Sequence, residues 1–272
     1  MKHSIATVIN YCTNDIDFIT QNIRQAAKFS QQIIVPVCDH FYDGTVENFL
    51  LLNHSIQQNP QAKFIKFKYN PHATRTLWRG WQLILRHLGF NHVWGPQYWI
   101  CFARHLGYQA INPPVEYVLF LDADEVIDGR KFLTWLNTNQ YKKFNALKPA
   151  NYWYWRSTKY QALDWEDSPL MARRPALKNA RFMDHDERNA TYKSIKGKKI
   201  RMILGLDQKP MIHHYGWAKP KKNLLKKVQT WGHSKDRNWT KLIEKEFSHP
   251  FNGTDFLAHY HYKTVKPFLN TV

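Results

Sequence analysis

The chain has 272 residues, and 39 Lys and Arg against 21 Asp and Glu give it a formal net charge of +18. This length suits one large α/β domain, or one such domain with an appended helical segment. No segment approaches the roughly 20 unbroken apolar residues of a membrane span, and the N-terminal residues lack a signal-peptide core. We therefore expect a cytoplasmic protein whose positive charge attracts an anionic partner such as nucleic acid, an acidic membrane or a phosphorylated substrate.

Predicted strands and helices alternate along the first third of the chain. Strands are expected at residues 4–10, 32–37 and 62–67, with a helix after Asp15 and another that begins near Val46. This alternation implies right-handed crossovers and a mostly parallel sheet. A Trp-rich stretch of helical character follows, with one helix beginning at Gly95 and Pro96. The next strand of the sheet is expected at residues 117–121.

The remaining elements are predicted less regularly. Residues 132–136 suggest a short helix, residues 146–157 and 170–177 suggest strands, and the chain becomes helical and basic from Pro220 onward. In the segment from 219 to 233, apolar residues recur on one side and lysines lie largely elsewhere. Such a helix either lies on an anionic membrane, which would suit a lipid-linked acceptor, or packs its apolar stripe on the core. We favour packing on the core, because surface helices generally carry this stripe.

The most informative segment is residues 116–128, where an apolar strand ends in acidic residues. Side chains alternate along a strand, so Asp122 and Asp124 project to the same side where the chain leaves the sheet. Ligands of open α/β sheets bind outside the carboxyl ends of the strands. Two oxygen donors there suit Mg²⁺ or Mn²⁺, which bind few protein carboxylates and complete their shells with water and substrate phosphates. The segment predicts a metal-bridged nucleotide site; the alternative is an acidic turn that caps a helix near Asp128.

Four segments of the first 130 residues support this interpretation by their order and spacing. They are the first strand with its helix, residues 33–39 with Asp43-Gly44-Thr45, Ala103-Arg104-His105-Leu106-Gly107, and Asp122-Ala123-Asp124-Glu125. Together they resemble glycosyltransferases of the GT-A fold, especially family 2, which use nucleotide-activated sugars. The sequence departs from that pattern at Pro36, at Cys38 in place of an acidic residue, and at His105 in place of asparagine.

The resemblance implies a domain organisation and a donor site. Residues 1–217 would form a GT-A catalytic domain, with a nucleotide-sugar half at 1–130 and an acceptor half at 131–217, and residues 218–272 would form a helical, basic extension. The donor would be a nucleotide-diphosphate sugar, most commonly a UDP-sugar, and the acceptor a glycan or a lipid-linked hydroxyl compound. The residues expected to contact the donor are Thr7, Asn10, Asp39, Asp43, Arg104 and Asp122.

The resemblance also implies metal ligands. Asp122 and Asp124 would hold Mn²⁺ or Mg²⁺, and a histidine of the segment His213-His214-Tyr215-Gly216-Trp217 would complete the metal shell or touch the diphosphate. His213 and His214 point to opposite faces if the segment is extended, so at most one of them should reach the metal.

Glycosyl transfer further needs a carboxylate that accepts the proton of the attacking hydroxyl. Asp186 is our first candidate, Glu187 the second and Asp167 the third. Direct attack assisted by such a base would invert the configuration of the sugar. The alternative is that residues 184–188 form a solvated charged loop.

Two other classes of function stay open. The charge, the acidic cluster and 14 histidines also suit a metal-dependent nuclease or phosphodiesterase. A non-catalytic module that binds nucleic acid or glycan would need the carboxylates only for structure. The parallel strand order and the Asp43-Gly44-Thr45 loop favour the transferase, so a nucleic-acid partner is not expected.

Overall fold

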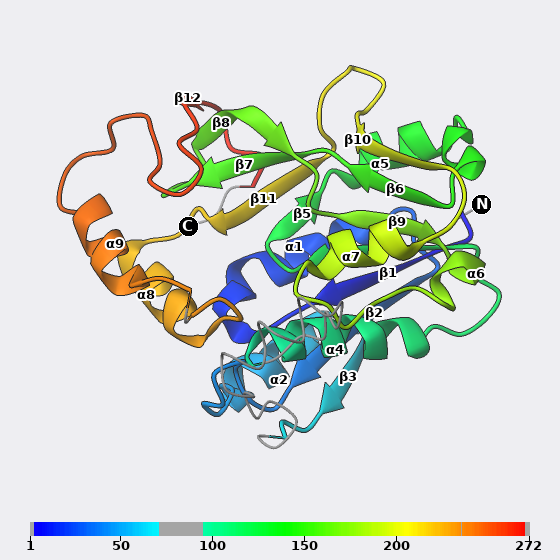
Figure 1. The fold of residues 1–272 in the computed structure, drawn as a ribbon, viewed down its shortest axis with the longest axis horizontal. Coiled ribbons are helices and arrows are strands. Elements are labelled where there is room, and N and C mark those ends of the chain that lie inside the picture. Colours follow the sequence, from blue (N-terminus) through cyan, green and yellow to red (C-terminus); the bar gives the residue numbers. More distant parts are fainter. Residues whose placement is uncertain (1–2, 71–94, 235, 270–272) are drawn as a thin grey trace, which may run out of the picture.

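A seven-stranded and a five-stranded sheet organise the computed structural model, which describes residues 3–70, 95–234 and 236–269 (Figure 1). The strands of the larger sheet are β1 (Ile5–Asn10), β2 (Gln32–Cys38), β3 (Lys63–Phe67), β4 (Tyr117–Asp122), β6 (Ala146–Pro149), β9 (Leu170–Arg173) and β10 (Lys199–Ile203). Their order is β10-β6-β9-β4-β1-β2-β3. The smaller sheet has the order β12-β8-β7-β11-β5. Its strands are β5 (Glu125–Ile127), β7 (Asn151–Trp155), β8 (Tyr160–Glu166), β11 (Ile212–Trp217) and β12 (Tyr262–Thr264).

Most neighbouring strands of the larger sheet run parallel. β1 pairs in parallel with β2 and with β4, β2 pairs in parallel with β3, and β6 pairs in parallel with β10. β9 is antiparallel to both β4 and β6. The predicted α/β class with a mostly parallel sheet is confirmed.

Helices cover both faces of this sheet, as alternation along the strands requires. Ile5 and Ile9 belong to the core on the side of α1 (Ile16–Ala26), α2 (Phe49–Gln58) and α5 (Gly129–Leu136). Ala6 and Val8 belong to the core on the opposite side, over which α4 (Gln97–Gln109), α6 (Arg174–Leu177) and α7 (Glu187–Ser194) lie. A Cβ on Gly107 would lie 2.4 Å from the Val8 side chain, so this glycine lets α4 approach β1 closely.

Three predicted elements need correction. Residues 146–157 form two strands, β6 and β7, which belong to different sheets. The strand expected at 170–177 ends at Arg173, and α6 follows because Pro175 is compatible with the first turn of a helix. The helix expected near Val46 begins at Phe49, where the Asn48 side chain accepts a hydrogen bond from Leu51 N at 3.1 Å. The Trp-rich stretch at 71–94 lies outside the described residues.

The C-terminal segment packs against the smaller sheet. α8 (Lys221–Thr230) buries Leu224 and Val228 in a cluster with Trp217 of β11 and Trp239 of α9 (Trp239–Glu246). β12 pairs antiparallel with β8. The favoured interpretation of the basic amphipathic helix, with its apolar stripe on the core, is confirmed for these residues. In the described ranges, none of the helices has the length and apolar character needed to cross a membrane.

Candidate active site

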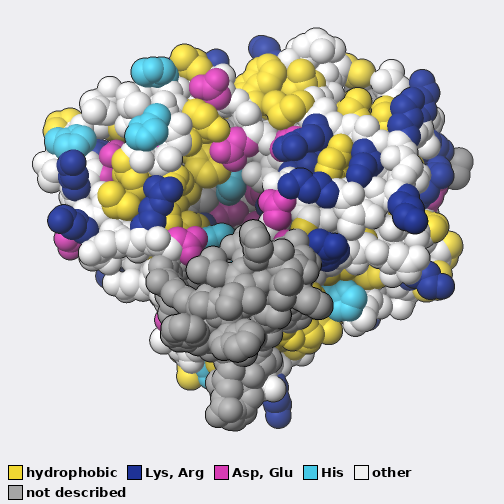
Figure 2. Space-filling view, viewed as in Figure 1, with side chains coloured by type: hydrophobic (Ala, Val, Ile, Leu, Met, Phe, Trp, Pro, Cys, Tyr) yellow, Lys and Arg dark blue, Asp and Glu magenta, His cyan; other side chains and the backbone are white. Residues whose placement is uncertain are grey.

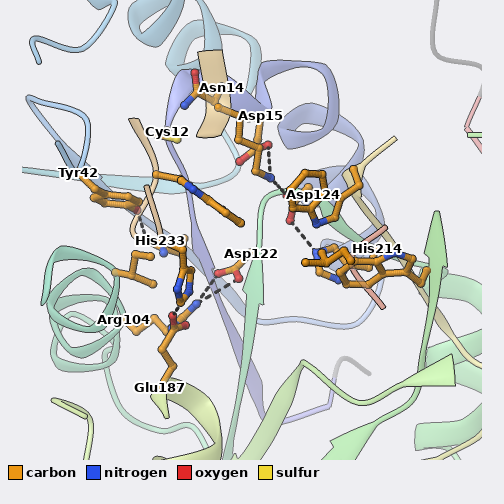
Figure 3. Close-up of a pocket in the computed structure, with 18 residues that line it drawn as sticks. Cys12, Asn14, Asp15, Tyr42, Arg104, Asp122, Asp124, Glu187, His214 and His233 are labelled. Atoms are coloured by element: carbon orange, nitrogen blue, oxygen red, sulfur yellow. Dashed lines mark hydrogen bonds and ion pairs between the residues drawn. The ribbon is translucent and has the colours of Figure 1, made fainter. Parts of the chain in front are cut away.

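A cavity of about 310 Å³ opens where β1 and β4 end, and side chains from both sheets and several helices line it (Figure 3). Figure 2 shows acidic and histidine side chains gathered around a hollow near the middle of the face that is seen in Figure 1. The polar side chains that line the cavity are Asn10, Cys12, Asn14, Asp15, Tyr42, Arg104, Asp122, Asp124, Glu187, His214, Lys227 and His233. The volume lies at the small end of the range of about 300 to 1,000 Å³ that is usual for ligand pockets.

Asp124 and His214 are brought together by the pairing of two short strands. β5 pairs antiparallel with β11, with His214 opposite Glu125, and Tyr215 N donates to Asp124 O at 2.8 Å. His214 Nε2 then lies 3.7 Å from Asp124 Oδ1. On the other side of the carboxylate, Lys227 Nζ of α8 lies 2.6 Å from Asp124 Oδ2. Burial raises the pKa of Asp124, but attraction by Lys227 and His214 outweighs it and holds that pKa well below its usual range.

Asp122 is held differently, between two guanidinium groups. Arg104 Nη2 of α4 donates to Asp122 Oδ1 at 2.9 Å, and Arg188 Nη2 of α7 donates to Oδ2 at 3.1 Å. Arg188 also binds the fully buried Glu125, which in turn accepts a hydrogen bond from Asp122 N at 2.8 Å. The acidic segment is therefore fixed by charge-assisted hydrogen bonds to both oxygens of the Asp122 carboxylate.

Glu187 faces the same cavity from the start of α7. Its carboxylate binds Arg104 Nη1 at 2.5 Å and lies 3.4 Å from His233 Nε2. Burial raises the pKa of Glu187, but attraction by Arg104 outweighs it, and the pKa falls well below its usual range. The hydrogen bond to Glu187, helped by Asp236 at 2.8 Å from Nδ1, raises the pKa of His233 to about 8.

Asp124 and His214 fit a divalent cation, and Gly216 makes room for it. Metal-to-ligand distances of about 2.1 Å allow two ligating atoms to lie up to about 4.2 Å apart, so the 3.7 Å between Asp124 Oδ1 and His214 Nε2 is suitable. A Cβ on Gly216 would lie 2.9 Å from His214 Nε2 and 3.2 Å from Asp124 Oδ2, filling the space between them. Among the described residues no group of three or more His, Cys, Asp or Glu is placed to hold a metal. The site thus suits an ion such as Mg²⁺ or Mn²⁺ that completes its shell with phosphate and water oxygens.

Several predicted donor-binding residues lie at this cavity and others do not. Asn10, Arg104 and Asp122 line it. Thr7 is fully buried and its hydroxyl pairs with Ser30 at 2.6 Å, inside the protein core. Asp39, at the end of β2, accepts hydrogen bonds from Tyr69 N and His40 Nδ1, both at 2.7 Å.

Asp43 belongs to an exposed turn. Its carboxylate accepts hydrogen bonds from Thr45 N at 3.0 Å and from the Thr45 hydroxyl at 2.8 Å. Neither Asp39 nor Asp43 is among the described residues that line the cavity.

The expected pair of histidines divides as strand geometry requires. His214 lines the cavity, whereas His213 points to the opposite side, where Tyr154 Oη lies 2.7 Å from its Nδ1 and Phe268 stacks on its ring. Burial lowers the pKa of His213 to about 3. His213 is therefore a neutral packed residue that does not reach Asp124.

The three candidates for the catalytic base separate as well. Glu187 lines the cavity, whereas the half-exposed Asp186 points away and binds Lys193 Nζ at 2.5 Å. Asp167 binds Arg201 Nε at 2.7 Å and lies 3.4 Å from Lys148 Nζ, at a separate hollow. Within the described part of the chain, Glu187 is the one of these three carboxylates that faces Asp122 and Arg104.

The cavity residues to which the sequence assigned no role include Asp15, Gly216, Lys227 and His233. Lys227 carried a readable signal, because it lies three residues after Leu224 and four before Trp231 and so borders the apolar stripe of α8. Asp15 forms an ion pair with Lys219, whose Nζ lies 2.9 Å from Asp15 Oδ1. In the sequence, Asp15 resembles an ordinary N-cap residue of α1. No local pattern distinguishes His233.

Some residues that line the cavity carry a buried polar atom that has no partner in the described part of the chain. Asn14 Oδ1, Arg104 Nε, His214 Nδ1 and Trp231 Nε1 are buried, and none has a hydrogen-bond partner within the described residues. Buried polar atoms in native proteins are generally paired. Such exceptions also occur away from the cavity, for example at Asn22 and Asn59.

The comparisons with known proteins are weak. No protein-family model and no curated protein matches the sequence. The structure resembles 4-diphosphocytidyl-2C-methyl-D-erythritol synthase from Anaerococcus prevotii, with a TM-score of 0.43 and 11% identity over 75% of this chain and 89% of that one.

Two further solved structures give the same TM-score. S. aureus TarS 1–349 has 11% identity and a TM-score of 0.43, over 91% of this chain and 73% of that one. Mannosyltransferase PcManGT from Pyrobaculum calidifontis, in complex with GDP-Man and Mn²⁺, has 8% identity and a TM-score of 0.43, over 87% of this chain and 64% of that one. Likenesses this low carry no argument about the activity of this chain.

Proposed function

We propose that the protein is a GT-A-type glycosyltransferase that moves a sugar from a nucleotide-diphosphate sugar to a hydroxyl group of an acceptor. The observation that carries this proposal is the facing pair Asp124 and His214, with Gly216 leaving open the space between them. Asp124 follows the carboxyl end of β4, which runs parallel to β1, and α/β sheets bind nucleotides at such ends. His214 faces it from β11 of the smaller sheet. Lys227 and Arg104 add positive charge beside it, as a diphosphate requires.

The cavity divides into a nucleotide side and a reaction side. Asn10 lies at the end of β1 with Tyr42, whose hydroxyl donates to Asn10 Oδ1 at 3.3 Å, and we assign this side to the nucleoside. Asp39 directly follows the neighbouring strand β2 and remains our candidate for a ribose or base contact. A UDP-sugar is the donor that we expect first.

The diphosphate belongs near Asp124, Arg104 and Lys227. Asp124 and His214 would hold a Mg²⁺ or Mn²⁺ ion, which supplies Lewis-acid stabilisation of the charge on the departing diphosphate. Both oxygens of Asp122 accept hydrogen bonds from Arg104 and Arg188, so we assign it to orienting these guanidinium groups. Arg104 then presents fixed positive charge to the diphosphate.

Glu187 is our candidate for the base that accepts the proton of the acceptor hydroxyl. Its ion pair with Arg104 lowers its pKa and makes it a weak base in the empty cavity. A bound diphosphate would share the positive charge of Arg104 with Glu187. The pKa of Glu187 then rises, and the carboxylate becomes a better base. Direct attack of the activated hydroxyl inverts the configuration at the anomeric carbon.

A lipid-linked acceptor is the variant of this proposal that brings the protein to a membrane surface. Lys221, Lys222 and Lys226 are exposed on α8 next to the cavity, and they are the side chains that would meet an anionic surface. A cytoplasmic location is part of the same proposal.

Thermal unfolding in the presence of nucleotides tests the proposal. Melting temperatures are measured with UDP, GDP, TDP and CDP, each with and without Mn²⁺, because a ligand of the native state raises the melting temperature. We expect a Mn²⁺-dependent rise with one nucleotide, lost in Asp124→Asn and retained in the control Asp207→Asn. Asp207 has a half-exposed side chain bound to Lys131. Absence of a rise with any of the four nucleotides would overturn the proposal.

A further inference from the structure

Lys227 places its ammonium group on Asp124, the carboxylate to which a divalent cation would bind. Its Nζ lies 2.6 Å from Asp124 Oδ2 and 3.5 Å from Asp15 Oδ1, and its side chain is 12% exposed. Lysines on amphipathic helices normally extend their charged ends into water. The exposed neighbours Lys222 and Lys226 follow that rule, so the inward path of Lys227 is specific to this position.

The ammonium group and a divalent cation compete for the same carboxylate, Lys227 through Oδ2 and the cation through Oδ1, which lies 3.7 Å from His214 Nε2. The space left by Gly216 borders Asp124 Oδ2, the atom that Lys227 holds, and His214 Nε2 lies on the other side of that space. Two positive charges on one buried carboxylate repel strongly, because little water screens them. A cation can therefore enter between Asp124 and His214 only when Lys227 moves away.

The charges around the cavity are already matched inside the protein. Four carboxylates line it, those of Asp15, Asp122, Asp124 and Glu187. Arg104, Lys227 and His233, whose pKa is raised to about 8, line it with them. Lys219 contacts Asp15 from behind, and Arg188 contacts Asp122 and the buried Glu125. A diphosphate alone would bring its negative charges beside carboxylates that already use these cations, and a divalent cation alone would leave Lys227 without its partner.

Lys227 can leave Asp124 without stranding Asp15. Lys219 Nζ stays 2.9 Å from Asp15 Oδ1 and also donates to Asn14 O at 2.7 Å, so Asp15 keeps a counter-charge. The lysine side chain has four flexible methylene groups and can redirect its charge within the cavity.

We propose that Lys227 is an exchangeable counter-ion of the donor site. It neutralises Asp124 in the empty site, leaves this carboxylate when a divalent cation binds to Asp124 and His214, and then pairs with the diphosphate. The cation and the diphosphate consequently bind with positive cooperativity. The cation frees Lys227 to pair with the diphosphate, and the diphosphate supplies Lys227 with a partner in place of Asp124. This inference rests on the proposed function, since it assigns the diphosphate of the donor to this cavity.

Binding of Mn²⁺ and inorganic pyrophosphate tests the exchange without knowledge of the base or the sugar. Free Mn²⁺ is counted by electron paramagnetic resonance while Mn²⁺ is titrated into the full chain, with and without pyrophosphate. The variants are Lys227→Met and the matched control Lys222→Met, which removes the same charge from the exposed face of the same helix.

We expect Lys227→Met to bind Mn²⁺ alone at least tenfold more tightly than the unaltered chain and Lys222→Met. We expect pyrophosphate to increase the Mn²⁺ affinity of the unaltered chain and of Lys222→Met. The factor of this increase should be at least tenfold smaller in Lys227→Met. Lys227→Gln, which keeps a hydrogen-bonding group, supplies the same comparison if the Met variant does not fold.

Equal Mn²⁺ affinity in Lys227→Met and the unaltered chain would overturn the inference. Lys227→Met could bind Mn²⁺ more tightly while neither pyrophosphate nor any nucleotide has an effect in any of the proteins. That result would support competition between Lys227 and the cation at Asp124. It would overturn the proposed donor and the pairing of Lys227 with the diphosphate.

Discussion

Arg188 shows how single buried charges hold the acidic segment in place. Its guanidinium group lies 3.1 Å from Asp122 Oδ2 and 2.8 Å from Glu125 Oε1, and Glu125 is fully buried. Loss of one partner of such a pair leaves an uncompensated charge in the interior, which costs about 3–5 kcal/mol. The arrangement fixes the backbone from which Asp122 and Asp124 project.

We therefore expect Arg188→Met to lower the free energy of unfolding by about 3–5 kcal/mol, measured by urea denaturation. Lys193→Met is the control, because its ion pair with Asp186 is largely exposed and should change stability by less than about 1 kcal/mol. The double variant Arg188→Met with Glu125→Gln should regain part of the loss. An unchanged denaturation midpoint in Arg188→Met would contradict this account.

At the scale of elements, α8 connects the C-terminal segment to the cavity. Leu224 and Val228 are buried on one side of the helix, while Lys227 reaches Asp124. The hydrophobic contacts therefore set the position of the charge. The sequence predicts residues 218–272 to be a helical, basic extension, and α8 and the turn after it supply Lys227, Trp231 and His233 to a cavity that residues of the 1–217 segment also line.

Leu224→Ala should lower stability by about 2–5 kcal/mol, because it leaves a cavity beside Trp217. It should also weaken the Mn²⁺-dependent effect of nucleotide on the melting temperature, since α8 carries Lys227. Leu52→Ala serves as the comparison: Leu52 is equally buried, in α2 on the other side of the large sheet. Equal loss of nucleotide binding in both variants would mean that the effect is one of general stability.

The elements that the sequence predicted well are those with local signals. β1, β2 and β4 are apolar runs of strand length, and α1 has apolar residues at helical spacing, so local periodicity is enough to place them. β5 has three residues and pairs with β11, which lies far along the chain. That long-range pairing brings His214 to Asp124, and the hydrophobic periodicity of neither segment predicts it.

The backbone conformation of Glu187 decides which of Asp186 and Glu187 faces the cavity. Glu187 has φ of 45°, in the left-handed region, where α7 begins. Non-glycine residues in this region are uncommon, and they concentrate at functional sites. This conformation belongs to the turn that directs Glu187 toward Arg104 and leaves Asp186 outside with Lys193, and neighbouring sequence letters do not reveal it.

For the molecule as a whole, the excess positive charge lies outside the cavity. The net charge is +18, whereas the four carboxylates that line the cavity are each paired with a cation. Exposed basic side chains gather at the end of α7 and the start of β10, where Lys193, Lys196, Lys198 and Arg201 lie. Attraction of polyanions should therefore be a property of the surface, separate from binding in the cavity.

This separation predicts how the protein behaves toward nucleic acid. It should bind a short single-stranded oligonucleotide at low salt, and log affinity should fall linearly with log salt concentration, because phosphate contacts release counterions. Asp124→Asn should bind the oligonucleotide as the unaltered chain does, and the oligonucleotide should stay intact with Mn²⁺ present. Affinities measured by fluorescence anisotropy at several salt concentrations, with gel analysis of the oligonucleotide, give both results. Cleavage that needs Mn²⁺ and disappears in Asp124→Asn would instead make the cavity the active site of a nuclease, because metal-dependent hydrolysis of phosphodiesters uses carboxylates of the same kind.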